Sequence, residues 1–154
     1  MPLYTLTYIS KAPQMRGDVR RQFINALVKQ ADGRNIPLGV SGCLVHVDDF
    51  FMQVLEGPRG DVSDTYNRIA RDERHDDVHI VCAEPLISRQ FPLPSLAVFD
   101  IESEDNPVFA KYRVGPQFSP YLLAPDALGD LLDQIALVCS KLDSVNRKGR
   151  DKAA

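Results

Sequence analysis

The pattern of hydrophobic and polar residues along this chain changes period several times. Short runs rich in β-branched, aromatic and leucine residues predict strands, because such side chains pack well on a pleated surface. Longer segments with apolar residues three and four apart predict amphipathic helices. The predicted strands are residues 3–9, 40–47, 50–56, 78–83 and 96–99. The predicted helices are residues 18–31, 61–71 and 124–142, with a shorter one at 106–113.

Turn and cap residues set the expected boundaries of these elements. Gly33 follows the first helical pattern and predicts a left-handed C-cap, which leaves Asn35 in a connector that leads back to the sheet. Residues 48–49 are both aspartate and lie between two strand patterns, so they predict a hairpin turn. Asp61 or Ser63 is expected to cap the second helix, where an acidic residue also suits the helix dipole.

The order of these elements predicts the fold class. A βαββαβ order followed by one more strand is typical of an α+β, ferredoxin-like sandwich with two helices on one face of the sheet. We expect this domain to span residues 1–100. The composition then changes, which predicts a C-terminal helical extension at 101–145 and a polar, disordered tail at 146–154. The helix at 124–142 is expected either to cover the other face of the sheet or to meet a partner.

Composition narrows the classes of function. The 154 residues are 44% hydrophobic and 25% charged, and the formal net charge is −3 without a basic stripe, so nucleic-acid binding is not expected. No apolar run reaches the roughly 20 residues that span a bilayer, and the N-terminus lacks the pattern of a secretory signal. Cys43, Cys82 and Cys139 are far apart and have no paired metal-ligand spacing. They favour packing roles in a reducing cytoplasm.

One polar residue stands in the most apolar short run of the chain. Gln53 lies within FFMQVLEGP at 50–58, where a strand is predicted. A buried amide left without partners costs roughly 1–3 kcal/mol, so another polar group must meet it. Tyr8 is the candidate, since its strand and that of Gln53 are adjacent and central in a ferredoxin-like sheet. The pair has two interpretations at this stage, a structural hydrogen bond in the core or part of a binding site.

A third polar group favours the binding interpretation. Asn35 follows the first helix and could converge with Tyr8 and Gln53 at one end of a cleft between helix and sheet. These three side chains donate and accept hydrogen bonds, but they include no strong base or activated nucleophile. Such a set suits the binding of a planar heterocycle better than the hydrolysis of a bond.

A cluster of cations follows the second helix in RIARDERHDD. It comprises Arg68, Arg71, Arg74 and His75. One interpretation is a solvated helix end, which cations stabilise through the helix dipole. The other is a phosphate or pyrophosphate site, for which the guanidinium geometry is well suited. The residues alone leave both interpretations open.

Together these motifs resemble the BLUF family, the blue-light sensors that use FAD. The matching stretches are LTYIS at 6–10, RNIPLGVSG at 34–42, FFMQVLEGP at 50–58, RIARDERH at 68–75 and RQF at 89–91. The resemblance covers roughly residues 3 to 99, and it implies the ferredoxin-like fold that the order of elements also predicts.

The resemblance implies a flavin site between the two helices. FAD is the expected cofactor, with FMN or riboflavin as alternatives, and its ring edge would face Tyr8 and Gln53. Asn35 would hold a flavin carbonyl, while Ile24 and Ile69 would flank the ring. The further residues implied at the site are Ser10, Arg34, Phe51, Arg68, Asp72, Arg74 and His75. Of these, Arg68 would serve the phosphates, and Asp72, Arg74 and His75 the carbonyl and ribityl side.

The resemblance also implies a light switch rather than an enzyme. Tyr8 would give an electron to the excited flavin, and a proton would move through Gln53, whose amide would then rotate or tautomerise. The flavin would end oxidised, with a stronger hydrogen bond at its C4 carbonyl and a slightly red-shifted absorption. The expected output is a light-dependent contact with a downstream signalling protein, with homo-oligomers also plausible.

The chain departs from the family pattern after RQF. It contains no tryptophan, and Pro94 and Leu96 stand where the family often has Trp and Met, so a Trp/Met exchange cannot carry the signal here. Arg34 also replaces an asparagine that often precedes Asn35. A light-insensitive regulator that keeps the flavin site is one alternative. An acylphosphatase-type enzyme is another, but SKAPQMRGD after the first strand has a single glycine and does not predict a phosphate-cradling loop.

Overall fold

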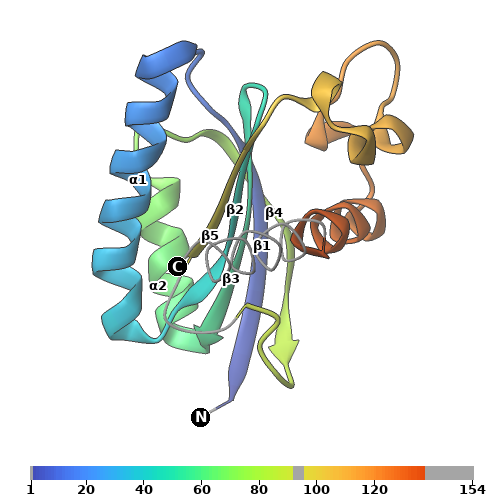
Figure 1. Cartoon of the computed structure of the whole chain (residues 1–154). Coiled ribbons are helices and arrows are strands. Elements are labelled where there is room, and N and C mark those ends of the chain that lie inside the picture. The colour runs from blue at the N-terminus through green and yellow to red at the C-terminus, as the bar shows by residue number, and fades with distance from the viewer. Residues whose placement is uncertain (1, 92–95, 138–154) are drawn as a thin grey trace, which may run out of the picture. The chain divides into compact units, whose positions relative to one another are not determined.

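The computed structural model describes residues 2–91 and 96–137, and it contains one five-stranded sheet with two long helices (Figure 1). The elements are β1 Leu3–Lys11, α1 Gly17–Leu38, β2 Ser41–Val47, β3 Phe50–Pro58, α2 Arg59–Ala70, β4 Asp76–Leu86 and β5 Leu96–Ile101. Pro94, Cys139, the predicted helix beyond residue 137 and the predicted tail lie outside the described residues.

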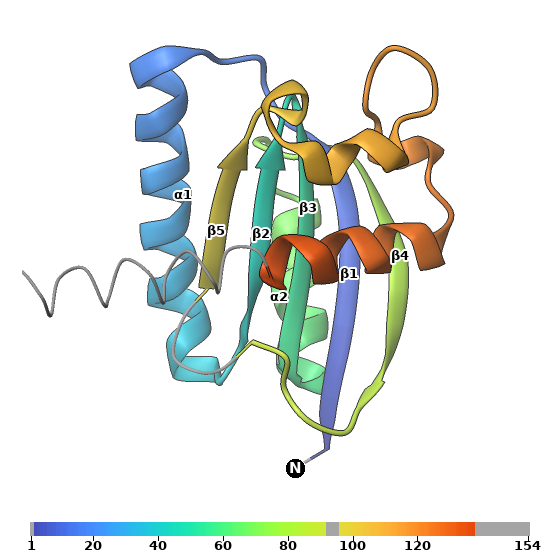
Figure 2. The ribbon, with the colours of Figure 1, turned by 45° about the vertical axis from the view of Figure 1, so that its right-hand side comes forward.

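The strand order β4-β1-β3-β2-β5 confirms the ferredoxin-like fold. Every neighbouring pair is antiparallel except β2 and β5, which run parallel. Both helices lie on the same face of the sheet, as Figures 1 and 2 show. β2, which follows α1, pairs with β3, and β4, which follows α2, pairs with β1. β1 and β3 also pair with each other near the centre of the sheet.

Four of the five strands are longer than the apolar runs that predicted them, and β2 is one residue shorter. β3 continues through Gly57 and Pro58, and β4 begins at Asp76 and ends at Leu86. Hydrogen bonds between strands use the backbone alone, so the ladder continues past the last apolar side chain. Gly57 and Pro58 therefore end β3 rather than forming a separate turn.

Helix α1 ends later than predicted. Gly33 lies inside the helix, and the left-handed C-cap is Gly39 with a φ of 69°. Asn35 is consequently in the last turns of α1 and not in a connector. Gly33 costs a helix only about 1 kcal/mol, which burial of apolar side chains such as Ile24 and Leu27 along the same helix can outweigh.

Helix α2 begins at Arg59, directly after β3, with Pro58 as its N-cap and no side-chain capping bond. The predicted caps Asp61 and Ser63 are therefore wrong, because both lie inside the helix. Asp61 is in the first turn, where its charge still suits the helix dipole.

Two groups of buried side chains lie between the helices and the sheet. One joins β1, β3 and α2 and comprises Leu6, Tyr8, Val40, Leu55 and Val62. The other joins α1, β2, β3 and β5 and comprises Ile24, Leu27, Leu44, Phe51 and Leu96. Each helix thus has its own core cluster, and the space between the two clusters positions the site described below.

The chain divides into two compact units between residues 105 and 106. In the second unit, Pro107–Tyr112 forms a 3-10 helix that Asn106 caps through Val108 N, at 3.1 Å. Residues 125–137 are helical, which agrees with the start of the predicted C-terminal helix. Leu137, near the end of this described segment, is 52% exposed. No helix in the described ranges is long and apolar enough to cross a membrane.

Candidate functional site

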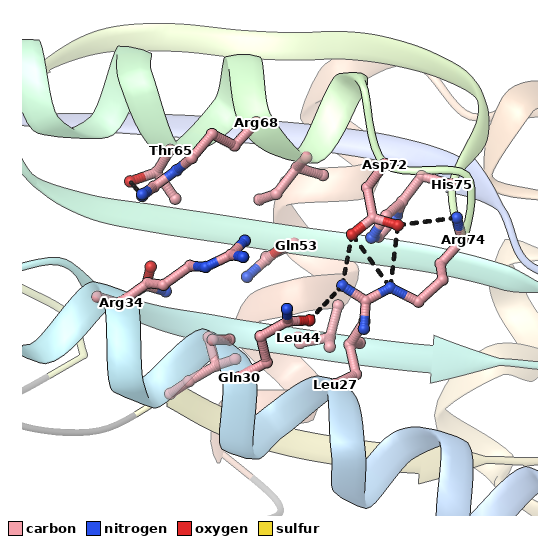
Figure 3. A pocket seen from close by; sticks show the side chains of 14 residues that line it. Leu27, Gln30, Arg34, Leu44, Gln53, Thr65, Arg68, Asp72, Arg74 and His75 are labelled. Carbon is pink, nitrogen blue, oxygen red and sulfur yellow. Dashed lines mark hydrogen bonds and ion pairs between the residues drawn. The ribbon is translucent and has the colours of Figure 1, made fainter.

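A pocket lies between α1 and α2 above the middle of the sheet (Figure 3). It is lined by Leu27, Gln30, Ala31, Arg34, Asn35, Leu44, Gln53, Thr65, Arg68, Ile69, Asp72, Arg74, His75 and Leu96. The pocket is partly open to solvent, and its cavity volume is about 60 Å³. Apolar side chains from the strands and both helices meet a rim of amides and guanidinium groups, which is a common composition for a small-molecule site.

Helical spacing brings the lining residues of α1 together. Leu27, Gln30, Ala31 and Arg34 are three or four apart, so they share one face of the helix. The facing side chains begin on α2 with Thr65, Arg68 and Ile69 and continue with Asp72 in the loop that follows.

The floor of the pocket comes from the sheet. Leu44 on β2 is the cross-strand neighbour of Gln53 on β3, and Leu96 enters β5 beside Gly42. Gln53 lies between the side chains from the two helices in Figure 3. It is therefore a polar group on an otherwise apolar floor.

Tyr8 meets Gln53 directly. The two residues are paired in the β1–β3 register, and the Tyr8 hydroxyl donates a hydrogen bond to Gln53 Oε1. This confirms the predicted cross-strand pair. Tyr8 has no exposed surface, and burial, followed by the neighbouring Tyr66 and Asp72, raises the pKa of Tyr8 well above its ordinary value. The phenol is therefore neutral and has one neutral acceptor, with the amide nitrogen of Gln53 left to face the pocket.

His75 lies beside this pair. Its Nδ1 is 3.0 Å from Ser10 Oγ, and its ring is 4.7 Å from that of Phe51 and 5.9 Å from that of Tyr8. Burial lowers the pKa of His75 to about 4, against the raising effect of Asp72. The imidazole is thus neutral at pH 7 and can hold a hydrogen bond without adding charge to the pocket.

A hydrogen-bonded network of Asp72, Arg74 and Gln30 joins the two sides of the pocket. Arg74 binds Asp72 through its side chain and backbone, and its Nη2 donates to Gln30 Oε1 on α1 at 2.6 Å. The hydrogen bonds from Arg74 lower the pKa of Asp72 to about 2. Figure 3 shows this network reaching from the loop after α2 to α1.

The structure brings most of the predicted site residues to one place. Eight of them line the pocket: Arg34, Asn35, Gln53, Arg68, Ile69, Asp72, Arg74 and His75. Tyr8, Ser10 and Phe51 lie just behind it, in contact with Gln53 or His75. Ile24 is in the core cluster of α1 and is not among the lining residues.

Six lining residues were missed by the sequence analysis. They are Leu27, Gln30, Ala31, Leu44, Thr65 and Leu96. Four of them follow from helical spacing once one residue per helix is placed at the site: Leu27, Gln30 and Ala31 precede Arg34 by one or two turns, and Thr65 precedes Ile69 by one. Leu44 and Leu96 require the strand register, for which the sequence carries no local signal.

Comparisons with known proteins agree with this geometry. The family model BLUF, described as sensors of blue light using FAD, matches residues 3–97. Photoactivated adenylate cyclase subunit beta of Euglena gracilis is 41% identical over 90 residues, which are 58% of this chain and 10% of that protein. The blue light- and temperature-regulated antirepressor BluF of Escherichia coli K12 is 31% identical over 104 residues, 68% of this chain and 25% of that protein. The chain thus matches a tenth to a quarter of the length of these relatives.

Solved structures share the fold. The photo-activated state of BlsA has a TM-score of 0.75 at 23% identity and covers 87% of this chain and 94% of its own, which supports the fold alone. BlrP1 of Klebsiella pneumoniae has a TM-score of 0.56 at 33% identity, over 64% of this chain and 24% of its own. The family match covers β1 to β4, the start of β5, both helices and the whole pocket. The chain therefore belongs to the BLUF family of blue-light sensors that use FAD.

Proposed function

We propose that in this chain Tyr8 and Gln53 are the light-switched pair of a flavin photosensor whose cofactor occupies the pocket between α1 and α2. The observation that carries this assignment is the hydrogen bond from the Tyr8 hydroxyl to Gln53 Oε1 on the pocket floor. Both side chains are buried, so neither can exchange protons freely with water.

The chemistry of the pocket fits a flavin. Leu27, Leu44, Ile69 and Leu96 offer apolar surfaces to a planar ring, and the amides of Asn35 and Gln53 can meet ring carbonyls and nitrogens. The cavity volume of about 60 Å³ is smaller than the few hundred Å³ of typical ligand sites. Gln30, Arg34 and Arg74 line the pocket with long, flexible side chains, and we propose that they rotate outward when the cofactor binds.

Two arginines suit the phosphates of FAD. Arg34 on α1 and Arg68 on α2 line the pocket from opposite sides. Arg68 Nη2 also donates to Thr65 Oγ1 at 3.2 Å, which directs the guanidinium along α2. Guanidinium groups bind phosphate oxygens in pairs of parallel hydrogen bonds, so these residues would hold the pyrophosphate while the ring enters the pocket.

A bound flavin excited by blue light supplies a one-electron oxidant. Tyr8 is the residue suited to donate the electron, since a phenol that loses an electron becomes a strong acid. Its proton has one acceptor in the structure, Gln53 Oε1. The raised pKa of Tyr8 means that the proton stays on the phenol in the dark. Once the electron has left, the proton can pass to Gln53 Oε1.

Gln53 converts this transfer into a lasting change. Its amide is neutral, so it can reverse its orientation or tautomerise without creating a buried charge. Reversal exchanges the donor and acceptor that face Tyr8 and the pocket. The hydrogen bonds of the ring would then differ between the dark and lit states, which is a local change able to bias a two-state element elsewhere.

A light-minus-dark absorption spectrum of the purified protein tests this function. The protein should be yellow and should show a reversible red shift of the flavin band under blue light. A bound flavin without the shift would instead support the light-insensitive regulator. Release of the cofactor by Arg68→Ala, but not by the exposed Arg21→Ala on α1, would support the phosphate site.

We also propose that a downstream signalling protein binds this chain in a light-dependent way. The relatives that match it are longer proteins whose names include an adenylate cyclase and an antirepressor. Capture of partners by immobilised protein, in light and in dark, would identify such a contact. The Gln53→Leu variant is the control, since it should capture the same partners under both conditions. A change of the chain's own oligomeric state with light is the alternative output.

A further inference from the structure

Tyr66 on α2 lies against the ring of Tyr8. The two ring centroids are 5.9 Å apart with their planes tilted by 59°, and Tyr66 packs against the core cluster of α2, to which Tyr8 belongs. The whole sequence contains no tryptophan, and tyrosine is therefore the most readily oxidised aromatic residue that the chain offers. In the part of the chain that the structure describes, Tyr66 is the tyrosine whose ring contacts that of Tyr8.

The two tyrosines differ in their surroundings. Tyr8 is fully buried and its hydroxyl is engaged by Gln53. Tyr66 is partly exposed, and the burial of part of its side chain raises its pKa. A phenol becomes easier to oxidise when water can take its proton, so an oxidised Tyr8 is flanked by a ring that can lose an electron at lower cost.

We infer that Tyr66 is an electron relay that reduces oxidised Tyr8 and carries the radical from the core to the surface of α2. This inference rests on the proposed role of Tyr8. One electron passes from the Tyr66 ring to Tyr8, and Tyr8 takes back its proton from Gln53. Tyr66 loses its phenolic proton to solvent water and becomes the neutral radical. The electron held by the flavin later returns through Tyr8 to the Tyr66 radical, which takes up a proton from water, so no outside reductant is needed.

The relay competes with the switch. A radical that moves to Tyr66 restores the phenol of Tyr8 before the Gln53 amide has settled in its new orientation. The consequence is a lower yield of the red-shifted state and a longer-lived radical near the surface. Tyr66→Phe should therefore raise the yield of the red-shifted state, because it removes the phenol while it keeps the packed ring.

The matched control is Tyr4→Phe. Tyr4 packs against the same core cluster, but it lies four residues along β1 from Tyr8, about 13 Å away at the rise of a strand. Its ring faces the Arg59 guanidinium at 4.8 Å. Loss of its hydroxyl should change neither the radical nor the yield.

The test uses the full chain loaded with FAD, frozen under blue light, and electron paramagnetic resonance of trapped tyrosyl radicals. The wild type and Tyr4→Phe should give the same long-lived radical, and Tyr66→Phe should lose it. Unchanged radical in Tyr66→Phe would overturn the relay. Tyr8→Phe separates a failure of the proposed role of Tyr8 from a failure of the relay. If Tyr8→Phe keeps a normal red shift, the proposed role of Tyr8 is wrong. If Tyr8→Phe loses the shift while Tyr66→Phe keeps the wild-type radical, only the relay is refuted.

Mass spectrometry after prolonged illumination gives a second measurement. A radical at the surface reacts with oxygen and with other tyrosines, so covalent oxidation should concentrate at Tyr66 and spare Tyr8. Oxidation that is equal in lit and dark samples at Tyr66 would contradict the relay even if the Tyr66→Phe variant were poorly folded.

Discussion

The Tyr8 hydroxyl donates a hydrogen bond to Gln53 Oε1 across the β1–β3 pair, where both side chains are buried. The bond joins the two central strands to the floor of the pocket. It satisfies a phenol that has no exposed surface, and it also gives that phenol its one proton acceptor. The same contact therefore contributes to stability in the dark and to proton transfer in the light.

Gln53→Leu should abolish the reversible red shift while flavin stays bound. Leucine keeps the volume of the side chain but removes the proton acceptor and the group that reverses. It also leaves the buried Tyr8 hydroxyl without its partner, which should lower the free energy of unfolding by about 1–3 kcal/mol. Difference spectroscopy and urea unfolding measure the two effects. Gln22→Leu at an exposed site of α1 is the control, and a normal red shift in Gln53→Leu would show that Gln53 is not the switch.

The sequence predicted the parts of this site that depend on strand order. The βαββαβ order predicts that the strands of Tyr8 and Gln53 are adjacent, which made Tyr8 the candidate partner of Gln53, and the register confirmed the pair. The end of α1 could not be predicted in this way, because Gly33 is a local signal and burial of Asn35 is a tertiary effect. The bond from Arg74 to Gln30 joins residues 44 positions apart, so no local pattern could indicate it.

Stability should fall as the pH decreases from about 6.5 to about 4, because His75 is buried and neutral. Its folded-state pKa is about 4, below the ordinary value of 6.5. Between these values the unfolded chain binds a proton that the folded chain does not, so acid favours unfolding. The total loss of stability from His75 should be on the order of 3 kcal/mol once its imidazole is protonated in both the folded and the unfolded chain.

Urea unfolding across this pH range measures the effect. His75→Gln should flatten the dependence while it keeps a hydrogen-bonding group for Ser10. Part of the slope should remain, since burial also lowers the pKa of His46. A further loss should follow between pH 3.8, the ordinary pKa of an aspartate, and about 2, the folded-state pKa of Asp72, because the unfolded chain binds a proton there that the folded chain does not. An identical slope in His75→Gln and wild type would contradict the assignment.

Asp100→Ala should destabilise the protein far more than Asp18→Ala. Arg20 is 6% exposed, and it donates to Asp100 Oδ1 from Nε at 2.9 Å and from Nη2 at 2.7 Å. Removal of Asp100 leaves this guanidinium with the Asp48 carbonyl at 3.0 Å and a longer contact to Glu102 at 3.6 Å.

The cost of leaving a buried cation without its partner is about 3 kcal/mol. The bond between Asp18 and Arg21 is exposed on both sides, so Asp18→Ala should cost less than about 1 kcal/mol. Thermal and urea unfolding of the two variants compare these values directly. Equal costs would mean that the solvent reaches Arg20 and that its pairing with Asp100 contributes little.

Gly42→Ala should prevent normal folding, because β2 and β3 approach too closely for a side chain at this position. A Cβ atom built on Gly42 would lie 1.8 Å from the carbonyl oxygen of Val54 and 2.9 Å from its carbon. Backbone atoms cannot rotate away, so the strands must separate, at a cost above about 4 kcal/mol. Leu44 on the pocket floor is two residues further along β2, and flavin binding should be lost with the strand pairing.

Gly60→Ala is the control, since nothing lies within 4 Å of its Cβ position and alanine favours the helix by up to about 1 kcal/mol. Near-normal unfolding of Gly42→Ala would show that the β2–β3 register at this point is wrong.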